Sequence, residues 1–377
     1  MENKSRRLLH QCYLAFLTVA AIAIAQPAIA TLFGGRPIII AHRGASGYLP
    51  EETLEAYQLA VQLRADFIEP DLWLSKDGVL VARHDGTLNP TTNVATYALT
   101  HPAILALGTG SPGNLQYAIA DFTFAQIQEL TATRRNSAGF RTPSPYFDAF
   151  PAGYDFNVMS LNGVLDYAYY VWLTTGRIVG VEPEAKATGY EQMILDTLND
   201  PKYGGFFDGH LGNVILQSFN LSSVAYWNSH SSIPSVYLVS CPSTAAAMQT
   251  VAQSADGIGI SLSTRTSETT AYGAPPTAAQ ITNAANAKLC ADRAHAAGLF
   301  VQAYTFYDIP SDYDLFLATG IDGIFSNFAD VGVRERNALF GVPGVPEPGT
   351  IPLLAGALLG LFWVSRRRTR AHSGMAA

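Results

Sequence analysis

Cysteine is scarce in this sequence. Only three of its 377 residues are cysteine, and two of them, Cys241 and Cys290, lie beyond the first 30 residues. Neither has the spacing of a metal site, so no cysteine-ligated metal centre is expected. An oxidising compartment would permit a disulfide between them, and the sequence leaves open whether they approach each other.

Charged residues are also few. They make up 14% of the chain, against 48% hydrophobic residues. This balance excludes a disordered chain, which lacks the apolar side chains that form a core. The length allows one large domain or two smaller ones.

The N-terminal end has the features of a targeting segment. A basic start precedes an apolar run at residues 13–25, and Ala28-Ile29-Ala30 follows with small residues in an A-x-A pattern. This order is typical of a secretory signal peptide over residues 1–30, cut after Ala30. A membrane anchor is the alternative, although the apolar run is short for a bilayer span.

The C-terminal end has three parts in a fixed order. A linker at 341–350 contains Pro346-Glu347-Pro348, an apolar run follows at 351–365, and four arginines lie within 366–377. The run is short for a transmembrane segment, and the arginines predict that the tail is cytoplasmic. Together the parts resemble the PEP-CTERM sorting signal. This resemblance implies an exosortase-type sorting enzyme as a partner, with a plain C-terminal membrane anchor as the alternative.

Between these ends the chain carries little positive charge. The leader holds three of the 23 basic and one of the 30 acidic residues, and the tail holds four arginines. The rest has 16 basic and 29 acidic residues, a net charge of −13. Nucleic-acid backbones require basic surfaces, so nucleic acid is excluded as a partner. An anionic substrate would need a local positive site.

Short apolar runs alternate with amphipathic stretches over residues 31–340. Helices are predicted at Thr53–Leu63 and at Ala278–Ala297, where Gly298 follows as a helix C-cap. Strands are predicted at 37–41, 66–72, 79–83, 178–182, 214–218, 236–239, 258–261, 300–305 and 324–326. The alternation predicts an α/β protein with a parallel sheet, either a (β/α)8 TIM barrel or an open doubly wound sheet.

Residues 95–156 interrupt this alternation. The segment is rich in threonine, proline, glycine and aromatic residues, and one helix is predicted at 121–130. In a barrel, an insertion after the C-terminal end of an early strand borders the active-site face. We expect a lid or substrate wall, with an inert surface excursion as the alternative.

Two acids on the second predicted strand point to a metal. Glu69 and Asp71 are two residues apart, so both side chains lie on one face of the strand. Buried carboxylates repel each other and are costly without a partner. A divalent cation resolves this conflict, and oxygen ligands favour calcium or magnesium over zinc. A solvated edge strand is the alternative for this pair alone.

Two histidines follow predicted strands, where the side chains of a barrel reach the catalytic face. His42 and Arg43 follow the first strand, and His84 follows the third. Imidazole can both accept and donate a proton near neutral pH. Arg43 offers a planar fork for phosphate oxygens, or a salt bridge to Glu51 or Asp85.

These segments together resemble the glycerophosphodiester phosphodiesterase family, in its exported, calcium-dependent bacterial branch. The matching motifs are His42-Arg43-Gly44, Pro50-Glu51-Glu52-Thr53, Glu69-Pro70-Asp71, His84-Asp85 and Pro183-Glu184-Ala185-Lys186. The resemblance extends from about Pro37 to Asp330 and favours the TIM barrel. It implies hydrolysis of glycerophosphodiesters to glycerol 3-phosphate and an alcohol. A phospholipase that acts on intact lipids and a non-catalytic, surface-displayed barrel are the alternatives.

The resemblance also implies a role for each site residue, with Ca²⁺ as cofactor and Mg²⁺ as the alternative. The catalytic pair is His42 and His84, and the metal ligands are Glu69, Asp71 and Glu184. The substrate side consists of Arg43 and Lys186 at the phosphate, Glu51 in support, and Phe219 and Tyr304 at the glycerol. The two aromatic residues have a core position as their alternative. The family more often has Asp where this chain has Asn327, and often Asn where it has Glu52.

Overall fold

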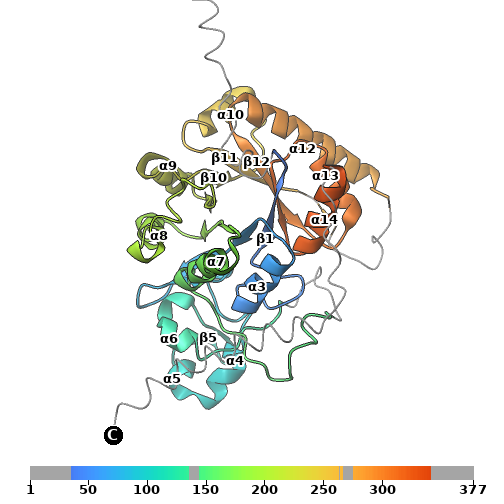
Figure 1. Cartoon of the computed structure of the whole chain (residues 1–377). Helices are drawn as coiled ribbons and strands as arrows, with labels where there is room; N and C mark the ends of the chain where they lie inside the picture. The colour runs from blue at the N-terminus through green and yellow to red at the C-terminus, as the bar shows by residue number, and fades with distance from the viewer. Residues whose placement is uncertain (1–34, 136–143, 263, 266–274, 341–377) are drawn as a thin grey trace, which may run out of the picture.

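The structure is a ring of parallel strands surrounded by helices, with one lobe that extends from it (Figure 1). The computed structural model describes residues 35–135, 144–262, 264–265 and 275–340. The ring strands are β1 (Ile38–His42), β2 (Phe67–Glu69), β3 (Asp71–Leu74), β7 (Gly180–Val181), β8 (Glu184–Ala185), β9 (Leu216–Ser218), β10 (Ser235–Leu238), β11 (Gly257–Ser261), β12 (Phe300–Phe306) and β13 (Gly323–Ser326). The surrounding helices are α3 (Leu54–Gln62), α7 (Leu161–Thr175), α8 (Glu191–Leu198), α9 (Leu221–His230), α10 (Ala245–Val251), α12 (Ala278–Ala296), α13 (Pro310–Leu317) and α14 (Ala329–Leu339), with a short 3-10 helix, η3 (Pro201–Tyr203), after α8.

Two of the strand positions are interrupted. Pro70 separates β2 from β3 and Pro183 separates β7 from β8, because proline lacks the N–H that a strand ladder needs. The halves still pair in parallel, β2 with β7 and β3 with β8. Pairing then continues from β8 through β9 to β13, and β13 pairs with β1, which pairs with β2. The described strands therefore close into the predicted (β/α)8 barrel, and the open sheet is wrong.

The alternation of side chains along the strands fills the inside of this ring. The buried residues that pack there are Ile38, Ile40, Phe67, Ile215, Val236, Leu238, Phe300 and Phe325. Because strand side chains alternate with a period of two, His42 continues the inward series of Ile38 and Ile40 at the end of β1. Glu69 likewise follows Phe67 at the end of β2. The same pattern that builds the core thus directs these two polar side chains toward the mouth of the barrel.

The helix α12 matches its prediction closely and carries a crosslink. Its first turn is stabilised by a capping box between Thr277 and Gln280, and it ends one residue before the predicted boundary. Cys290 on this helix forms a disulfide with Cys241, which follows β10, so the pairing that the sequence left open does occur. Closing a loop with a sequence separation of 49 stabilises the fold by about 4 kcal/mol in the chain-entropy account.

The strand predicted at 79–83 forms, but it does not join the ring. It is β4 (Leu80–Ala82), which pairs with β3 in the antiparallel direction. The chain reverses in a turn where Gly78 has a φ of 80° and Ser75 Oγ accepts from the Val79 N–H. Apolar alternation has the same period in parallel and antiparallel strands, so the pattern did not separate this strand from the barrel strands.

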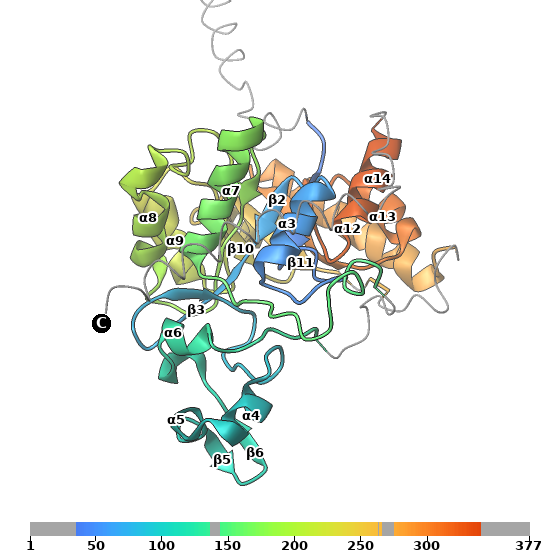
Figure 2. The same ribbon diagram turned by 60° about the horizontal axis from the view of Figure 1, so that its bottom comes forward.

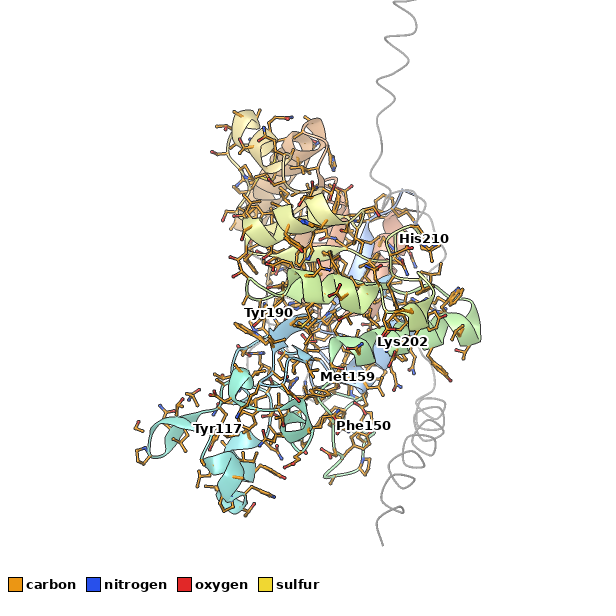
Figure 3. All side chains as sticks on the ribbon, turned by 90° about the vertical axis from the view of Figure 1, so that its left-hand side faces the viewer. Tyr117, Phe150, Met159, Tyr190, Lys202 and His210 are labelled. Atoms are coloured by element: carbon orange, nitrogen blue, oxygen red, sulfur yellow. A yellow bond between two sulfur atoms is a disulfide. The ribbon has the colours of Figure 1, made fainter. Side chains whose placement is uncertain are left out.

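The segment between β4 and α7 forms the protruding lobe (Figure 2). Its elements are α4 (Val94–Tyr97), η1 (Ala98–Thr100), α5 (Pro102–Leu105), β5 (Thr109–Ser111), β6 (Asn114–Gln116), η2 (Ile119–Asp121) and α6 (Phe124–Ile127). The helix predicted at 121–130 is therefore present only as the shorter α6. In Figure 3, Tyr117 and Phe150 lie in this lobe and Met159 lies where it meets the barrel. There the Met159 carbonyl accepts from the Ala82 N–H at 2.9 Å.

Both predicted targeting segments lie outside the described residues. These are the leader at 1–30, and the linker, apolar run and tail from residue 341 onward. Among the helices of the described ranges, none combines the length and the apolar character that crossing a bilayer requires.

Candidate active site

The register of the barrel brings the predicted site residues to one end of the ring. His42 lies opposite Glu69 on β1 and β2, and Asp71 lies opposite Glu184 on β3 and β8. Glu184 in turn lies opposite Gln217 on β9. His42 and Glu69 end β1 and β2, whereas Asp71 and Glu184 begin β3 and β8, directly after the proline breaks. The register places these residues beyond the C-terminal ends of β1, β2 and β7, the end of a barrel where enzymes carry their active sites.

The three acids form a buried cluster. One carboxylate oxygen from each of Glu69, Asp71 and Glu184 lies within 4.8 Å of the others. Their exposed fractions are 1%, 1% and 5%. Both oxygens of Asp71 and Oε1 of Glu184 are contacted by the cationic groups of Arg43 and Lys186, in ion pairs. Buried carboxylates this close together repel one another, and a hard cation with oxygen ligands would relieve that repulsion. The cluster therefore fits a divalent cation.

Hydrogen bonds to Glu69 orient the cluster from two sides. The Arg43 backbone N–H donates to Glu69 Oε2 at 2.9 Å, and Gln217 Nε2 donates to Oε1 at 3.2 Å. Arg43 adopts a left-handed backbone with a φ of 58°, which costs of order 1 kcal/mol for a non-glycine residue. The neighbouring Gly44 has a φ of 79°, and a Cβ there would come within 2.8 Å of the Ala56 backbone. The strained loop thus turns an N–H toward the acids.

Two cationic side chains contact the same cluster. Arg43 Nε lies 2.9 Å from Asp71 Oδ2, and Arg43 Nη1 lies 3.3 Å from Glu51 Oε1. Lys186 Nζ lies 3.1 Å from Asp71 Oδ1 and 2.9 Å from Glu184 Oε1. The predicted salt bridge from Arg43 thus involves Glu51, and it involves Asp71 as well.

These charges divide the acids by protonation state. Burial acts to raise the pKa of Asp71, but Lys186 and Arg43 hold that pKa well below its usual range. Burial and the charge of Asp71 raise the pKa of Glu184 to about 8, with Lys186 opposing them. Burial and the charge of Asp71 also raise the pKa of Glu69 well above its usual value. In the metal-free protein, Asp71 is therefore ionised, whereas Glu184 retains a proton near neutral pH.

His42 is bonded to a neutral partner. Its Nδ1 lies 2.7 Å from Asn327 Oδ1, which also accepts from Ser46 Oγ at 3.1 Å. Because an amide oxygen only accepts, Nδ1 carries the proton and Nε2 carries the lone pair. Burial, and then the charge of Arg43, lower the pKa of His42 to about 3. Asn327, which the resemblance marked as a minor departure, is thus the direct partner of His42.

His84 has a charged partner and a more exposed position. Its Nδ1 lies 3.3 Å from Asp85 Oδ1, and 35% of its side chain is exposed. The Trp73 indole donates to the His84 carbonyl at 3.0 Å, which fixes the backbone there. Burial acts to raise the pKa of Asp85, yet its bonds to His84 and Arg135 hold that pKa below its usual value.

Arg135 belongs to this site, although the sequence did not indicate it. Its Nε and Nη2 donate to the two oxygens of Glu51 at 2.9 Å and 2.6 Å, and Nη2 also contacts Asp85 Oδ2. Although burial acts to raise it, the pKa of Glu51 is lowered to about 2 by Arg43 and Arg135. The one sequence feature that could have indicated an arginine in the site is the composition of residues 95–156, which contain three arginines and no lysine.

Glu52 is a second residue whose place was not foreseen. It is fully buried, and its Oε1 accepts from the Asp71 N–H at 3.0 Å while Tyr57 bonds to Oε2. Burial and the charge of Asp71 raise the pKa of Glu52 well above its usual value. This side chain supports the strand break before Asp71.

The two predicted aromatic residues lie beside Lys186. Phe219 is 53% exposed, and its ring centroid lies 6.0 Å from Lys186 Nζ. Tyr304 packs edge-on against Phe219 at a centroid distance of 6.2 Å. Burial, and then the charge of Glu184, raise the pKa of Tyr304 to about 12, so its hydroxyl stays protonated. An apolar wall thus adjoins the cationic side of the cluster.

Comparison with known proteins agrees with this geometry. The glycerophosphodiester phosphodiesterase of Bacillus subtilis is 29% identical over 303 residues, which cover 78% of this chain and 85% of that protein. An Arabidopsis thaliana glycerophosphodiester phosphodiesterase is 31% identical over 220 residues, which cover 54% of this chain and 56% of that protein. The chain spans about half the length of the first curated relatives it matches, at 56% and 50%.

The fold has solved counterparts. A crystal structure from Silicibacter pomeroyi, named after the same kind of enzyme, superposes with a TM-score of 0.57 at 20% identity and covers 82% of this chain and 96% of that one. At this identity the likeness supports the barrel fold alone.

Two family models match the sequence. The PEP-CTERM protein-sorting motif matches residues 344–368, which confirms the predicted sorting signal. The glycerophosphoryl diester phosphodiesterase family matches residues 42–331, from the end of β1 into α14. The chain therefore belongs to the glycerophosphoryl diester phosphodiesterase family.

Proposed function

We propose that this protein is an exported, metal-dependent phosphodiesterase that hydrolyses glycerophosphodiesters to glycerol 3-phosphate and an alcohol. One observation carries the proposal: at the mouth of the barrel, His42 lies opposite Glu69, Arg43 contacts Asp71, and His84 interacts electrostatically with Asp71, around a buried triad of Glu69, Asp71 and Glu184. Phosphodiester cleavage needs a proton acceptor, a proton donor and positive charge at the phosphate, and this group of residues offers all three.

Glu69, Asp71 and Glu184 would hold the cation. Their oxygen donors favour Ca²⁺, with Mg²⁺ as the alternative. When bound, a divalent cation neutralises charge on the phosphate oxygens as a Lewis acid. The convergence of the three buried carboxylates supports this role, since one oxygen from each lies within 4.8 Å of the others.

His42 is the proposed base and His84 the proposed acid. The Nε2 lone pair of His42 is available because Nδ1 is bonded to Asn327, and the low pKa keeps the ring neutral at pH 7. His42 would take the proton from the nucleophile, either water or the glycerol hydroxyl of the substrate. His84, paired with the Asp85 carboxylate, would give a proton to the leaving alkoxide as the P–O bond breaks.

Arg43 and Lys186 would bind the phosphate oxygens, with Glu51 holding the Arg43 guanidinium in place. Phe219 and Tyr304 would pack against the carbon atoms of the glycerol. Their adjacency to Lys186 supports this arrangement, because glycerol and phosphate are joined in the substrate.

The direct test measures glycerol 3-phosphate released from glycerophosphocholine, with Ca²⁺ or Mg²⁺ present. Turnover that chelation abolishes is expected, and no turnover across several head groups would refute the proposal. Hydrolysis of diacyl lipids but not of deacylated substrates would favour a phospholipase. Very weak cation binding would favour a non-catalytic barrel.

The PEP-CTERM motif supports export and sorting to the cell envelope, to the periplasm, cell surface or extracellular space. An exosortase-type enzyme would recognise Pro346-Glu347-Pro348 and remove the apolar run that follows. The mature chain should then lack the leader and end near this motif. Intact-mass measurement of the native protein checks this, and a mature chain that retains residues 351–364 would indicate a membrane anchor instead.

A further inference from the structure

Arg135 is carried into the site by a segment of the insertion that is fixed from both sides. Ala132 pairs with Thr92 on one side, and Thr131 pairs with Asn157 on the other. The Ala132 N–H donates to the Phe156 carbonyl at 2.7 Å. These bonds fix the backbone a few residues before Arg135, so the position of its guanidinium depends on the fold of the lobe.

The guanidinium of Arg135 is bonded to a buried carboxylate whose backbone is also hydrogen-bonded. Glu51 is 1% exposed, and it accepts both of the Arg135 hydrogen bonds described above. The buried Arg83 holds the backbone carbonyl of Glu51 through Nη1 at 2.7 Å. Paired N–H donors against one carboxylate define both position and orientation. Glu51 therefore serves as a fixed point for Arg135.

Asp85 links Arg135 to His84. Its Oδ2 contacts Arg135 and its Oδ1 lies 3.3 Å from His84 Nδ1. A carboxylate held at both oxygens has a defined plane, and the imidazole that bonds to it has a defined ring orientation. The bond from Trp73 restrains the His84 backbone, and within the part of the chain that the structure describes, Asp85 is the hydrogen-bond partner of the ring.

We propose that Arg135 is a positioning residue for the proton donor: through Asp85 it directs Nε2 of His84 toward the leaving-group oxygen. This inference rests on the proposed function. It gives the insertion a task in the reaction, because the lobe supplies the group that orients His84. The proton moves from His84 to the alkoxide as the P–O bond to the alcohol breaks, and Arg135 itself contacts no reacting atom.

The test compares two leaving groups. Choline leaves as a basic alkoxide and needs a proton, whereas p-nitrophenolate leaves without one. Comparing kcat for glycerophosphocholine with kcat for the p-nitrophenyl ester of glycerol 3-phosphate therefore distinguishes a defect in proton donation by His84 from a general loss of structure. The variants are Arg135→Gln, Arg135→Lys and Asp85→Asn. Arg134→Gln is the matched control, because it removes the same charge one residue away, where the guanidinium lies 5.4 Å from the Phe147 ring centroid.

Arg135→Gln should lower kcat for glycerophosphocholine by about 10- to 100-fold, as loss of an outer partner does, and leave kcat for the nitrophenyl ester nearly unchanged. Asp85→Asn should show the same selectivity, and the double variant should add little to either single change. Arg135→Lys should lose less activity than Arg135→Gln, since the lysine ammonium keeps the positive charge but not the bidentate geometry of the guanidinium. Arg134→Gln should match the wild type, and Ca²⁺ affinity by calorimetry should be the same in all variants.

Equal losses on both substrates in Arg135→Gln would overturn the inference and indicate a structural role. A raised KM on both substrates would overturn it as well, and would place Arg135 at the phosphate. Failure of the proposed function looks different: the wild type would then turn over neither substrate, or His84→Ala would lose no activity on glycerophosphocholine.

Discussion

The two histidines of the site are held by different parts of the molecule. His42 ends a barrel strand, and its partner Asn327 follows β13, the strand that pairs with β1. His84 follows β4 outside the ring, and its partner Asp85 is bonded to Arg135 from the insertion. The first environment is buried with a neutral partner, and the second is partly exposed with a charged one. Closing the barrel is enough to build the surroundings of His42, the proposed base, whereas the surroundings of His84, the proposed acid, also need the lobe.

Substitution of either histidine should have the largest effect on kcat, and the two variants should differ in their dependence on the leaving group. His42→Ala should lower kcat by about 100- to 10,000-fold on both leaving groups, because the nucleophile must lose its proton in either case. His84→Ala should show such a loss with glycerophosphocholine and a much smaller one with the nitrophenyl ester. Steady-state kinetics on the two substrates measures both effects.

Calorimetry with Ca²⁺ provides the control, since neither histidine is a proposed ligand and the affinity should be nearly unchanged. If excess cation restored activity to the histidine variants, or if both variants lost the two substrates alike, the division into base and acid would be wrong.

The acids that lie between the two histidines should respond in the opposite way. Asp71→Ala and Glu184→Ala should weaken Ca²⁺ binding by more than the ~10- to 100-fold typical of an outer partner, because each removes a ligand. Excess cation should therefore restore part of the activity. Asp208→Asn, at an exposed acid on the loop after η3, is the control and should bind Ca²⁺ normally. Activity of the ligand variants that no cation concentration restores would argue against a metal role.

The affinity for the metal should depend strongly on pH below about pH 8. The pKa of Glu184 is raised to about 8 in the metal-free protein, so this ligand must lose a proton when the cation binds. As the pH falls below 8, the affinity should decrease by about tenfold per pH unit for this proton. Calorimetry in buffers of different ionisation enthalpy should detect the released proton. A flat affinity between pH 6 and pH 8 would contradict this.

The smallest effect is expected from a substitution that gives His42 a charged partner, as His84 already has. Asn327→Asp places a carboxylate against Nδ1 of His42, which should raise the pKa of that ring from about 3 by about 1 to 3 units. A base with a raised pKa becomes protonated at a higher pH, so the acid limb of kcat should move upward. The measurement is a pH profile at saturating cation, with Ser46→Ala as the control for loss of the neighbouring hydrogen bond. An unmoved acid limb would mean that His42 is not the base.

Local sequence determined the parts of the site that lie on strands. The period of two that places Ile38 and Ile40 inside the ring also directs His42 inward, and Glu69 follows Phe67 for the same reason. The presence of the strands, the α12 boundary and the family motifs could therefore be predicted, since each depends on residues a few positions apart. The antiparallel direction of β4 could not, because the period is the same for both directions. The breaks at Pro70 and Pro183 were not predicted.

Tertiary structure alone decided which side chains complete the site. Asn327 reaches His42 across 285 positions, Arg135 reaches Glu51 across 84, and Cys241 pairs with Cys290 across 49. Such contacts depend on which strands become neighbours when the ring closes and on how the lobe folds back. The insertion has no apolar period to predict its path, so nothing local indicated where Arg135 would lie. Local patterns set the direction of a side chain, and only the closed barrel and its lobe set its partner.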